Sequence, residues 1–546
     1  MTSYKIGLDF GTTNSIISYL EGERLVAFRY GTPGQQEEYV PSFVAYDGEI
    51  VEIGTAARTT AVNHPAAQHY ANFKMRLPLP EGNFERFFTP PRSPMSVTAD
   101  YLHELLVSSD NPYSFCSERG EIAALVVSVP EIWQRDIYNL GRSRLQKLIR
   151  ELGLPLVQLI SEPVAAAAYY AWEITNHSQD AQEGPFCGNL LVCDMGGGTF
   201  DVSLCRLHGN QKVEVLYFDG QGEGLASAGV AFDRRCVQLA WAKKHGQPLE
   251  ENDPEFLRLL REFELVKLAT HPKMLKKFAN YLKLPDAYTE QIAYIFAGGY
   301  GVSFGEVRQA FAEIAQTIGE VMARIQAWLE HNQETIDRLF LVGGFSQFPL
   351  VQRAILEALA MEESDPRYRR FNLVSSTYAI SYGACLIANG LIDPTERYVH
   401  TLGITINREI AIAPAQGEAH LEIQEEAVTL IPGGTGLNQL ELPRFYHQPL
   451  VAWQASFPVP IWVDPRTRGK RFKQFTPEQV SLPNFSPSAQ YRVGMRVDAS
   501  QVAYLVIEEI NSAARLEYEL GNLIAQMFPG FVLSESGEVR LKPDGP

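Results

Sequence analysis

Two segments far apart in the chain share one pattern, an apolar run that ends in aspartate and then turns through glycine and threonine. The first is Ile6–Asn14 (IGLDFGTTN) and the second is Leu190–Asp201 (LLVCDMGGGTFD). A second apolar run follows each turn, at Ser15–Leu20 and Val202–Leu204. This pattern predicts two β-hairpins whose tips expose backbone N–H groups, because glycine lets the backbone approach an anion closely. Two such tips that face each other would form a clamp for phosphate groups.

The aspartate before each turn, Asp9 or Asp194, adds a second requirement. Carboxylates at strand ends can hold a hydrated magnesium ion, which takes a few carboxylates together with waters and phosphate oxygens. One such hairpin, taken alone, is ordinary sheet structure. Two of them, each with its aspartate and with a subdomain's length between them, predict a site for a nucleoside triphosphate and magnesium.

Size and composition restrict the class of protein. At 546 residues the chain can hold several subdomains around more than one core. The net charge of −17 argues against a general affinity for nucleic acid. The apolar stretches do not reach the length of a membrane helix, and the N-terminus enters a strand without a signal peptide. The six cysteines are scattered without Cys-x-x-Cys spacing, so we expect reduced thiols in a cytoplasmic protein.

Strand-like and helix-like segments alternate up to about residue 395, which predicts mixed sheets flanked by helices. Strands are expected at Lys5–Phe10, Ile16–Leu20, Ala123–Val129, Leu190–Asp194, Val202–Leu207 and Leu339–Val342. Helices are expected at Gln134–Leu152, Pro163–Ile174, Phe232–Lys244, Phe256–Ala269, Phe304–Asn332, Leu350–Ala360 and Ala379–Asn389. The apolar stripe of Phe304–Asn332 indicates a long helix with one buried face.

The pattern changes near residues 393–400, and from there short strands are broken by proline and glycine. This is typical of a β-rich domain. Strands are expected at Leu402–Ile412, Ala419–Ile423, Phe457–Val463, Tyr491–Val497 and Val502–Ile507, and one short helix at Ala513–Met527. We therefore predict a first domain at 1–392, a short linker at 393–400 and a β-rich domain at 401–546.

Five motifs, in a fixed order along the chain, resemble the nucleotide-binding domain of the DnaK-type heat shock protein 70 family. They are Asp9–Ser15 (DFGTTNS), Ile160–Ala167 (ISEPVAAA), Asp194–Val202 (DMGGGTFDV), Leu341–Pro349 (LVGGFSQFP) and Ser381–Ala384 (SYGA). The likeness covers about residues 4–390 and identifies the chain as a divergent member of this family, within the actin-like ATPase superfamily. It implies an α/β fold in which a two-lobed actin-like ATPase domain with duplicated mixed sheets precedes a smaller β-rich domain.

The resemblance also implies a cleft that binds ATP or ADP with Mg²⁺. Asp9 and Asp194 would hold the metal ion through water. The residues expected to cradle the phosphates are Gly11, Thr12, Thr13, Gly196, Gly197, Gly198 and Thr199. Phosphoryl transfer depends on positioning and on charge neutralisation, which suits such a set.

Four residues match the family's catalytic positions, namely Lys74, Glu162, Thr199 and Asp201. Lys74 would contact the γ-phosphate and orient the attacking water, and Glu162 and Asp201 would help to position that water or the metal shell. Two plainer interpretations stay open. Lys74 can be a solvated surface lysine, and Glu162 can be a carboxylate at a helix N-terminus before Pro163.

The base pocket departs from the family pattern. Residues matched to it are Gly229, Gly343 and Gly344, which let backbone pack against sugar and adenine, together with Glu264 and Lys267 at the ribose. The alternative for Glu264 and Lys267 is an ordinary surface ion pair one helical turn apart. The family's two adenine-contacting arginines are replaced by Leu268 and Gln347, which bears on nucleotide affinity and selectivity.

The family resemblance implies an ATP-dependent chaperone: slow Mg²⁺-dependent ATP hydrolysis would be coupled to the binding of an unfolded or extended polypeptide by the β-rich domain. A co-chaperone and an exchange factor would be further partners. The chain, however, lacks the family's leucine-rich linker in residues 392–400, and its long helical lid. These departures motivate a second hypothesis, an ATP-binding scaffold or switch that docks one dedicated partner and has little general chaperone activity. A filament-forming relative of actin is the third.

Overall fold

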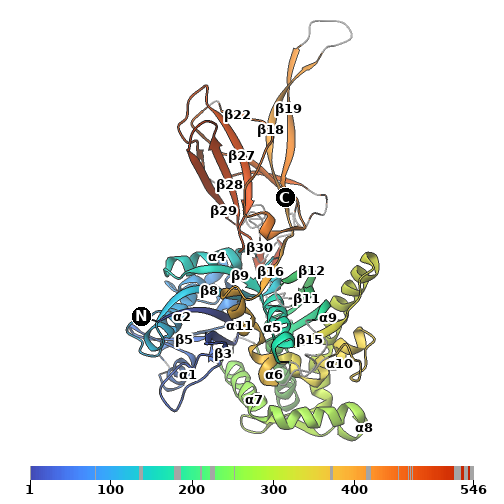
Figure 1. The fold of residues 1–546 in the computed structure, drawn as a ribbon. Coiled ribbons are helices and arrows are strands. Elements are labelled where there is room, and N and C mark those ends of the chain that lie inside the picture. The colour runs from blue at the N-terminus through green and yellow to red at the C-terminus, as the bar shows by residue number, and fades with distance from the viewer. Residues whose placement is uncertain are drawn as a thin grey trace.

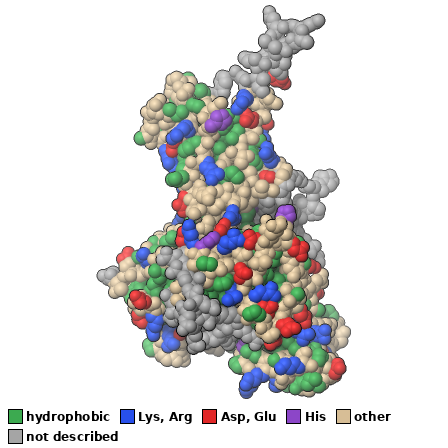
Figure 2. All heavy atoms as spheres, turned by 45° about the vertical axis from the view of Figure 1, so that its right-hand side comes forward, with side chains coloured by type: hydrophobic (Ala, Val, Ile, Leu, Met, Phe, Trp, Pro, Cys, Tyr) green, Lys and Arg blue, Asp and Glu red, His purple; other side chains and the backbone are tan. Residues whose placement is uncertain are grey.

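The chain divides into an α/β part and a β-rich part, and the β-rich part rises from one end of the other (Figures 1 and 2). The computed structural model describes residues 2–64, 66–79, 81–134, 139–177, 186–209, 212–221, 228–250, 253–368, 373–412, 420–452, 454–464, 467, 469, 471–476, 478–521, 531–533 and 539–541. Up to about residue 395 these residues form helices and mixed sheets, and beyond it they form mainly short strands. This order confirms the fold class predicted from the sequence.

The first mixed sheet contains the first glycine-threonine turn. Its strands are β1 (Ser3–Phe10), β2 (Asn14–Glu21), β3 (Arg24–Ala27), β4 (Val40–Pro41), β8 (Glu121–Val129) and β9 (Leu156–Ser161), in the order β3-β2-β1-β8-β9 with β4 paired to β2. Strand β1 runs antiparallel to β2 and parallel to β8. The predicted hairpin is therefore present, and Asp9 lies near the end of its first strand.

The second mixed sheet repeats this arrangement around the second turn. Its strands are β10 (Cys187–Met195), β11 (Phe200–His208), β12 (Lys212–Gln221), β15 (Arg338–Val342) and β16 (Asp393–Thr395), in the order β15-β10-β11-β12-β16. Strand β10 runs antiparallel to β11 and parallel to β15, as β1 does to β2 and β8. The predicted duplication of a hairpin beside a parallel strand is thus confirmed.

Two helices, α5 (Glu162–His177) and α11 (Leu373–Ala388), pack between the two sheets in a shared apolar core. Small residues let them approach closely, since a Cβ built at Gly383 would lie 1.7 Å from Ala165 O. Helix α11 also touches β1, where a Cβ at Gly7 would lie 2.2 Å from Cys385 N. Figure 1 shows α5 and α11 at the centre of the α/β part, between the strands of the two sheets.

The remaining helices cover the outer faces. They are α1 (Gly54–Asn63), α2 (Pro94–Leu106), α3 (Phe115–Glu118), α4 (Asn139–Glu151), α6 (Gly229–His245), α7 (Pro254–Lys283), α8 (Pro285–Tyr288), α9 (Phe304–Asn332) and α10 (Pro349–Ala358), with 3-10 turns η1 (Phe73–Arg76), η2 (Glu81–Arg86), η3 (Glu131–Gln134) and η5 (Phe345–Gln347). Helix α9 has the predicted bounds, because Ser303 and Glu306 form a capping box at its start. The prediction for α7 was too short: Met274, Phe278 and Tyr281 stay buried, so packing carries the helix past Pro272.

Two smaller sheets extend the α/β part on either side. One contains β5 (Phe43–Asp47), β6 (Ile50–Ile53) and β7 (Gln68–Ala71), and the other is the hairpin of β13 (Ile292–Phe296) and β14 (Tyr300–Ser303). The first leads directly into η1, which bears Lys74. The second packs with α6, α7 and α9 around a core rich in aromatic side chains.

The β-rich part is built on two sheets that share one apolar core. The first contains β18 (Thr401–Ile412), β19 (His420–Ile431), β24 (Pro460–Asp464) and β25 (Phe472–Phe475), and the second β21 (Arg444–Phe445), β22 (Leu450–Val451), β27 (Gln490–Val497), β28 (Ala503–Glu509) and β29 (Arg515–Gly521). Shorter strands are β17 (Arg397–Tyr398), β20 (Thr435–Gly436), β23 (Ser456–Phe457), β26 (Val480–Ser481), β30 (Phe531–Leu533) and β31 (Val539–Leu541). The helix predicted at Ala513–Met527 was wrong over β29, where Leu516, Tyr518 and Leu520 alternate as strand residues and pair with β28. Residues 522–527 lie outside the described residues.

The two parts contact each other through the segment 393–400 and through one turn of the β-rich part. Strand β16 adds to the second sheet beside β12, in parallel. In the turn between β27 and β28, Ser500 accepts a 2.7 Å hydrogen bond from Arg142 Nε with its carbonyl, and its hydroxyl accepts one of 3.1 Å from Leu159 N. Among the described residues, none of the helices has both the length and the apolarity that a membrane span requires.

Candidate active site

The two glycine-threonine tips face each other. A Cβ built at Gly197 would lie 2.8 Å from Thr13 Cγ2, and one at Gly198 would lie 3.0 Å from Thr12 Oγ1. Any side chain at these glycines would collide with the opposite tip, whereas a Cβ at Gly196 would meet nothing within 4 Å. The prediction that the tips form the two halves of one clamp is consistent with this geometry, because the backbone of one reaches the threonines of the other.

The first tip is held by a residue that sequence reasoning missed. The Ser42 hydroxyl donates a 2.7 Å hydrogen bond to Gly11 O, and Ser42 N donates one of 2.9 Å to Thr13 O. Gly11 itself has no room for a side chain, since a Cβ would lie 2.1 Å from Asn14 O. Ser42 follows β4 without any motif around it, so only the pairing of β4 with β2 reveals its role.

The second tip is held by the start of α6. Gly229 N donates a 3.2 Å hydrogen bond to Gly196 O, and Val230 N donates one of 2.8 Å to Gly197 O. Helix N-termini carry free N–H groups and a partial positive charge, so this junction makes the tip a favourable environment for an anion. The structure places Gly229 against the second tip, and its predicted role at the sugar and adenine stays a prediction.

Gly343 brings the turn after β15 against Asp194. Its φ of +84° lies in the left-handed region, and a Cβ there would lie only 2.3 Å from Asp194 Oδ1. Ser346 Oγ donates a 2.8 Å hydrogen bond to Gly343 O and so fixes the turn. The neighbouring Gly344 has φ of −62° and open space around its α-carbon. Of the two predicted glycines, only Gly343 is required by the geometry.

Lys74 is buried in the cleft and is not a surface residue. Its ammonium lies 2.6 Å from Glu162 Oε1, and the Lys74 side chain is only 1% exposed. The rings of Phe10 and Trp133 flank the ammonium, with centroids 5.5 and 5.8 Å from Nζ. The interpretation of Lys74 as a solvated lysine is therefore wrong. Glu162 does begin α5, as its plainer interpretation required, and it pairs with Lys74 as well.

Four carboxylates gather around this single lysine. Asp9 accepts a 2.9 Å hydrogen bond from Ser128 Oγ, and burial with the nearby Glu162 raises the pKa of Asp9 to about 7. Burial also raises the pKa of Asp194 well above its ordinary value, and the charges of Glu162, Asp201 and Asp9 add to this rise. The excess of negative charge in a desolvated site fits a divalent cation, which would relieve the repulsion.

Lys267 forms an ion pair with an acid other than Glu264, the partner that the surface ion-pair interpretation named, and the ribose contacts of both residues stay a prediction. Lys267 Nζ lies 2.7 and 2.6 Å from the two carboxylate oxygens of Asp233, so it pairs across to α6 instead of with Glu264 on its own helix. Burial raises the pKa of Asp233 to about 6, against the lowering effect of Lys267. Glu264 adds to that rise, which places its carboxylate nearby. Sequence reasoning missed Asp233 because its partner is 34 residues away.

The two residues that replace the adenine-contacting arginines are found in different environments. Leu268 is 56% exposed on α7. Gln347, at the end of η5, donates a 3.2 Å hydrogen bond to Ser376 Oγ, which ties its amide to the segment that begins α11. Beside it the rings of Phe345 and Phe348 stack 5.5 Å apart. Both rings belong to a buried apolar core, and the Lys267 ammonium lies 5.9 Å from the centre of the Phe345 ring.

The comparisons with known proteins show the family to which the chain belongs. The family model described as Hsp70 protein matches residues 93–399, more than half of the chain. The chain belongs to the Hsp70 family. Membership of the Hsp70 family supports a chaperone-type ATPase, and the second tip, at Gly196–Thr199, lies within the matched residues.

Three relatives within the Hsp70 family bear the name chaperone protein DnaK. That of Thermosipho melanesiensis is 26% identical over 397 residues, which is 70% of this chain and 59% of the relative. Those of Thermosipho africanus and Thermotoga neapolitana are 26% identical over 366 residues and 25% over 398, with 65% and 70% of this chain and 54% and 59% of the relatives covered. The chain thus spans less than two thirds of the length of these Hsp70 relatives.

Proposed function

We propose that this Hsp70-family chain is a chaperone-like ATPase in which slow Mg²⁺-dependent ATP hydrolysis in residues 1–392 is coupled to polypeptide binding by residues 401–546. The observation that supports it best is the buried Lys74–Glu162 pair beneath two facing tips, beside Asp9 and Asp194. A cationic group and a set of carboxylates held out of water are what positioning of a triphosphate and its metal requires.

Each site residue then has a role in this proposal. The tips, from Gly11 to Thr13 and from Gly196 to Thr199, would cradle the phosphates, and Asp9 and Asp194 would hold Mg²⁺ through its waters. The bound metal ion would neutralise charge on the phosphates. Lys74, fixed by Glu162, would donate to the γ-phosphate and orient the attacking water. Thr199, the last residue of the second tip, and Asp201, paired with Asp194 across β10 and β11, would complete the catalytic set.

The base would lie against the turn at Gly343 and Gly344 and the start of α6 at Gly229. Lys267 and Glu264 would reach the ribose, with Asp233 holding the Lys267 ammonium in place. Gln347 and the Phe345 ring would replace the guanidinium contacts of the family. An aromatic wall recognises a ring by shape more than by charge, so we expect weaker discrimination between ATP and other nucleotides.

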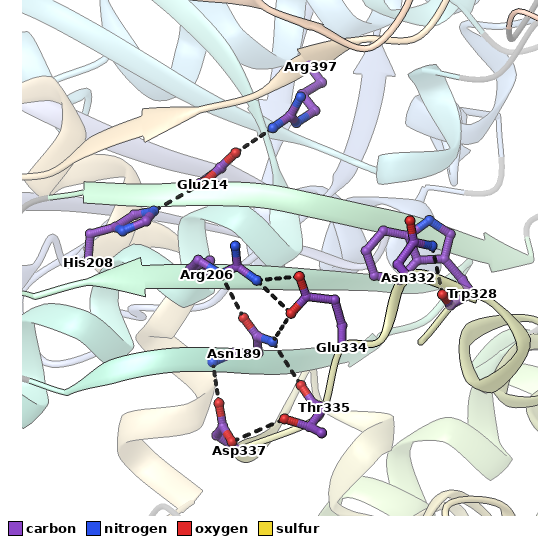
Figure 3. A network of polar contacts seen from close by, with 10 residues as sticks. All are labelled: Asn189, Arg206, His208, Glu214, Trp328, Asn332, Glu334, Thr335, Asp337 and Arg397. Carbon is purple, nitrogen blue, oxygen red and sulfur yellow. Dashed lines mark hydrogen bonds and ion pairs between the residues drawn. The ribbon is translucent and has the colours of Figure 1, made fainter. Parts of the chain in front are cut away.

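Coupling is supported by the way residues 393–400 join the two parts. Strand β16 extends the sheet that contains the second tip. Arg397, in β17, forms an ion pair with Glu214 and donates hydrogen bonds to Val215 O (3.2 Å) and Gly434 O (2.9 Å). Figure 3 shows Glu214 between Arg397 and His208, with His208 Nε2 3.2 Å from the carboxylate. A leucine run is therefore not needed to attach this linker.

The experiment that tests the proposal is single-turnover ATP hydrolysis by the full chain with Mg²⁺, with and without an unfolded peptide. Lys74→Ala should lower the rate about 100-fold or more, because it removes a preorganised cation from the phosphates. Nucleotide affinity, measured separately with a fluorescent ATP analogue, should change far less. Lys147→Ala is the matched control, because Lys147 is 75% exposed on α4. An unchanged rate in Lys74→Ala would contradict the catalytic assignment.

Peptide binding tests the coupling. We expect the unfolded peptide to stimulate hydrolysis and to bind more tightly with ADP than with ATP. Equal peptide affinities in the two nucleotide states would contradict an Hsp70-type cycle. A co-chaperone and an exchange factor would then have no cycle to act on, and the second candidate function would be favoured.

That second candidate is an ATP-binding switch that docks one dedicated partner, and the long hairpin β18–β19 favours it. The hairpin projects well beyond the rest of the β-rich part (Figure 1). Ile423 on its outer half is 66% exposed, and Glu422 and Glu425 are exposed beside it. Deleting residues 407–427 should abolish capture of a single stoichiometric partner and leave ATP hydrolysis unchanged. Broad protection of unfolded model substrates by the deletion variant would contradict this function.

A further inference from the structure

A buried carboxyl group, Glu131, lies between the two parts and has no role in the proposed ATPase chemistry. It stands at the start of η3, directly after β8, and is 1% exposed. Ser203 on β11 donates a 3.4 Å hydrogen bond to Glu131 Oε2. Val129, two residues before Glu131, is the register partner of Ser161 at the end of β9.

A second buried carboxyl group reaches the same place from the linker. Glu396, between β16 and β17, is 4% exposed, and its Oε1 accepts a 3.3 Å hydrogen bond from Ser161 N. Both acids therefore lie at the end of β9, because Ser161 N binds Glu396 and Ser161 is the register partner of Val129, two residues before Glu131. Each of the two acids comes from a different part of the chain, so they meet only while the linker is docked.

Only one cation among the described residues is shared by the two acids. Arg142 on α4, itself 1% exposed, lies 3.5 Å from Glu396 Oε2 and is further engaged by Ser500 O and Leu159 O, at 2.7 and 2.5 Å. One guanidinium can neutralise one carboxylate. Two buried carboxylates near each other repel, which favours the protonated form of the second acid.

The other groups that face Glu131 do not supply a second positive charge. From β11 these are Asp201, whose charge raises the pKa of Glu131, and the buried thiol of Cys205, whose pKa is itself raised by burial and by both glutamates. From β9 and α4 they are the Ser161 hydroxyl and Arg142. The described surroundings therefore hold three carboxyl groups against one guanidinium.

We propose that Glu131 and Glu396 form a proton-dependent latch that fastens the linker and the β-rich part to the α/β part. In the docked state Glu131 carries the proton and Glu396 carries the charge paired with Arg142. Loss of that proton places two negative charges in one desolvated site and drives the linker segment out. The latch does not depend on nucleotide hydrolysis, so it stands or falls separately from the proposed function.

The direction of the pH effect follows from linkage. Burial, with the charges of Glu396 and Asp201, raises the pKa of Glu131 from 4.5 to about 8 in the docked state. When the linker leaves, the charge of Glu396 is removed and the pKa falls. The docked state then binds more protons, so docking is strongest at low pH and weakens as pH rises through about 8. Because a single proton is released, the docking equilibrium constant can change by at most about tenfold per pH unit.

Cleavage by trypsin after Arg397 provides the measurement on the full chain. This arginine lies within the docked linker, so its rate of cleavage under native conditions follows the population of the undocked state. Glu131→Gln mimics the protonated acid in size and charge. The ratio of the wild-type rate to the Glu131→Gln rate at each pH cancels the pH dependence of trypsin and of other groups, including the His208–Glu214–Arg397 contact.

We expect this ratio to be near one at pH 6 and at least tenfold higher at pH 9. Glu396→Gln leaves one acid beside Arg142. Its cleavage rate should therefore lack this rise with pH, as that of Glu131→Gln does. Glu151→Gln is the matched control on α4, exposed and beside Lys147, and should behave as wild type. Circular dichroism verifies that each variant is folded. A ratio that stays constant from pH 6 to pH 9, or a Glu131→Gln chain already open at pH 6, would overturn the latch.

Discussion

At the scale of single residues, the buried ammonium of Lys74 is the group on which the site depends. It lies 2.6 Å from Glu162, and its charge opposes the rise that burial causes in the pKa of both Asp9 and Asp194. The single positive charge of Lys74 therefore offsets the negative charges of several acids, whereas each acid is only one of several negative groups. The two members of the ion pair are for this reason not equivalent.

The loss of stability should therefore differ between removal of the Lys74 charge and removal of the Glu162 charge. Lys74→Met should destabilise the metal-free protein by about 3–5 kcal/mol, since it leaves buried carboxylates uncompensated. Glu162→Gln should cost much less, because Asp9 and Asp194 still face the ammonium. Urea unfolding of both variants at neutral pH measures the difference. Equal losses of stability would mean that the pair acts in isolation from the other acids.

Asp233 gives a prediction for pH. Its pKa is raised from 3.8 to about 6 in the folded protein, so the folded state holds a proton that the unfolded chain has lost. This contribution to stability is complete below pH 3.8 and disappears as pH rises through about 6. Between pH 4.5 and pH 7 wild type should lose ~2 kcal/mol more unfolding free energy than Asp233→Asn. Parallel stability profiles of the two proteins in urea would contradict this.

At the scale of elements, the site is a set of strand ends and helix starts brought against one another. Strands β10 and β15 run in parallel, so the turn after β15 passes over Asp194 at the end of β10. The left-handed backbone at Gly343 is what allows this close approach. The next residue, Gly344, serves as an internal comparison because its α-carbon faces open space.

Alanine substitution at these two neighbouring glycines should therefore have unlike effects. Gly343→Ala should cost about 3 kcal/mol or more, by adding left-handed strain to an overlap with Asp194. It should also weaken Mg²⁺-dependent nucleotide binding, because the carboxylate must move. Gly344→Ala should change the melting temperature and nucleotide affinity little. Calorimetric melting with and without ATP and Mg²⁺ checks both, and equal effects would show that the turn is not held against Asp194.

At the scale of the whole molecule, the β-rich part is joined to the α/β part by buried polar contacts. Arg142 is at the centre of these contacts, since it binds Ser500 O, Leu159 O and Glu396 while it is almost fully buried. Arg150, two helical turns further along α4, reaches Asp498 and Glu519 only at 3.6 and 3.7 Å and is half exposed. The division at residues 392 and 400 stays a prediction, supported by the separate apolar core of the β-rich part.

The two arginines should contribute very differently to docking. Arg142→Met should weaken docking by about 3–5 kcal/mol, because it removes the guanidinium that faces the buried Glu396 carboxylate. Arg150→Met should cost about 0–1 kcal/mol, as for exposed ion pairs. Small-angle X-ray scattering should give a larger radius of gyration for Arg142→Met alone. Expansion in both variants, or in neither, would contradict Arg142 as the centre of the contact.

Local patterns in the sequence were sufficient for much of the fold. The two hairpins and most of the helices, including α9 with its capping box at Ser303, follow from short-range rules of turn geometry, capping and apolar spacing. Those rules failed where packing overrode them, as at Pro272 within α7, or where a period of two was hidden in a polar stretch, as in β29. The five motifs also located both tips and their aspartates, because each motif is contiguous.

The tertiary structure alone decided which charges meet. Lys74 and Glu162 are 88 residues apart, and Arg142 and Glu396 are 254 apart. Spacing along the chain holds no information about such pairs, since their distance is set by how two sheets and a docked linker pack. Burial then sets the strength of those charges: it keeps the Lys74–Glu162 pair out of water and raises the pKa of Glu131. The sequence by itself determined the elements and their tips, and long-range packing determined the electrostatics between them.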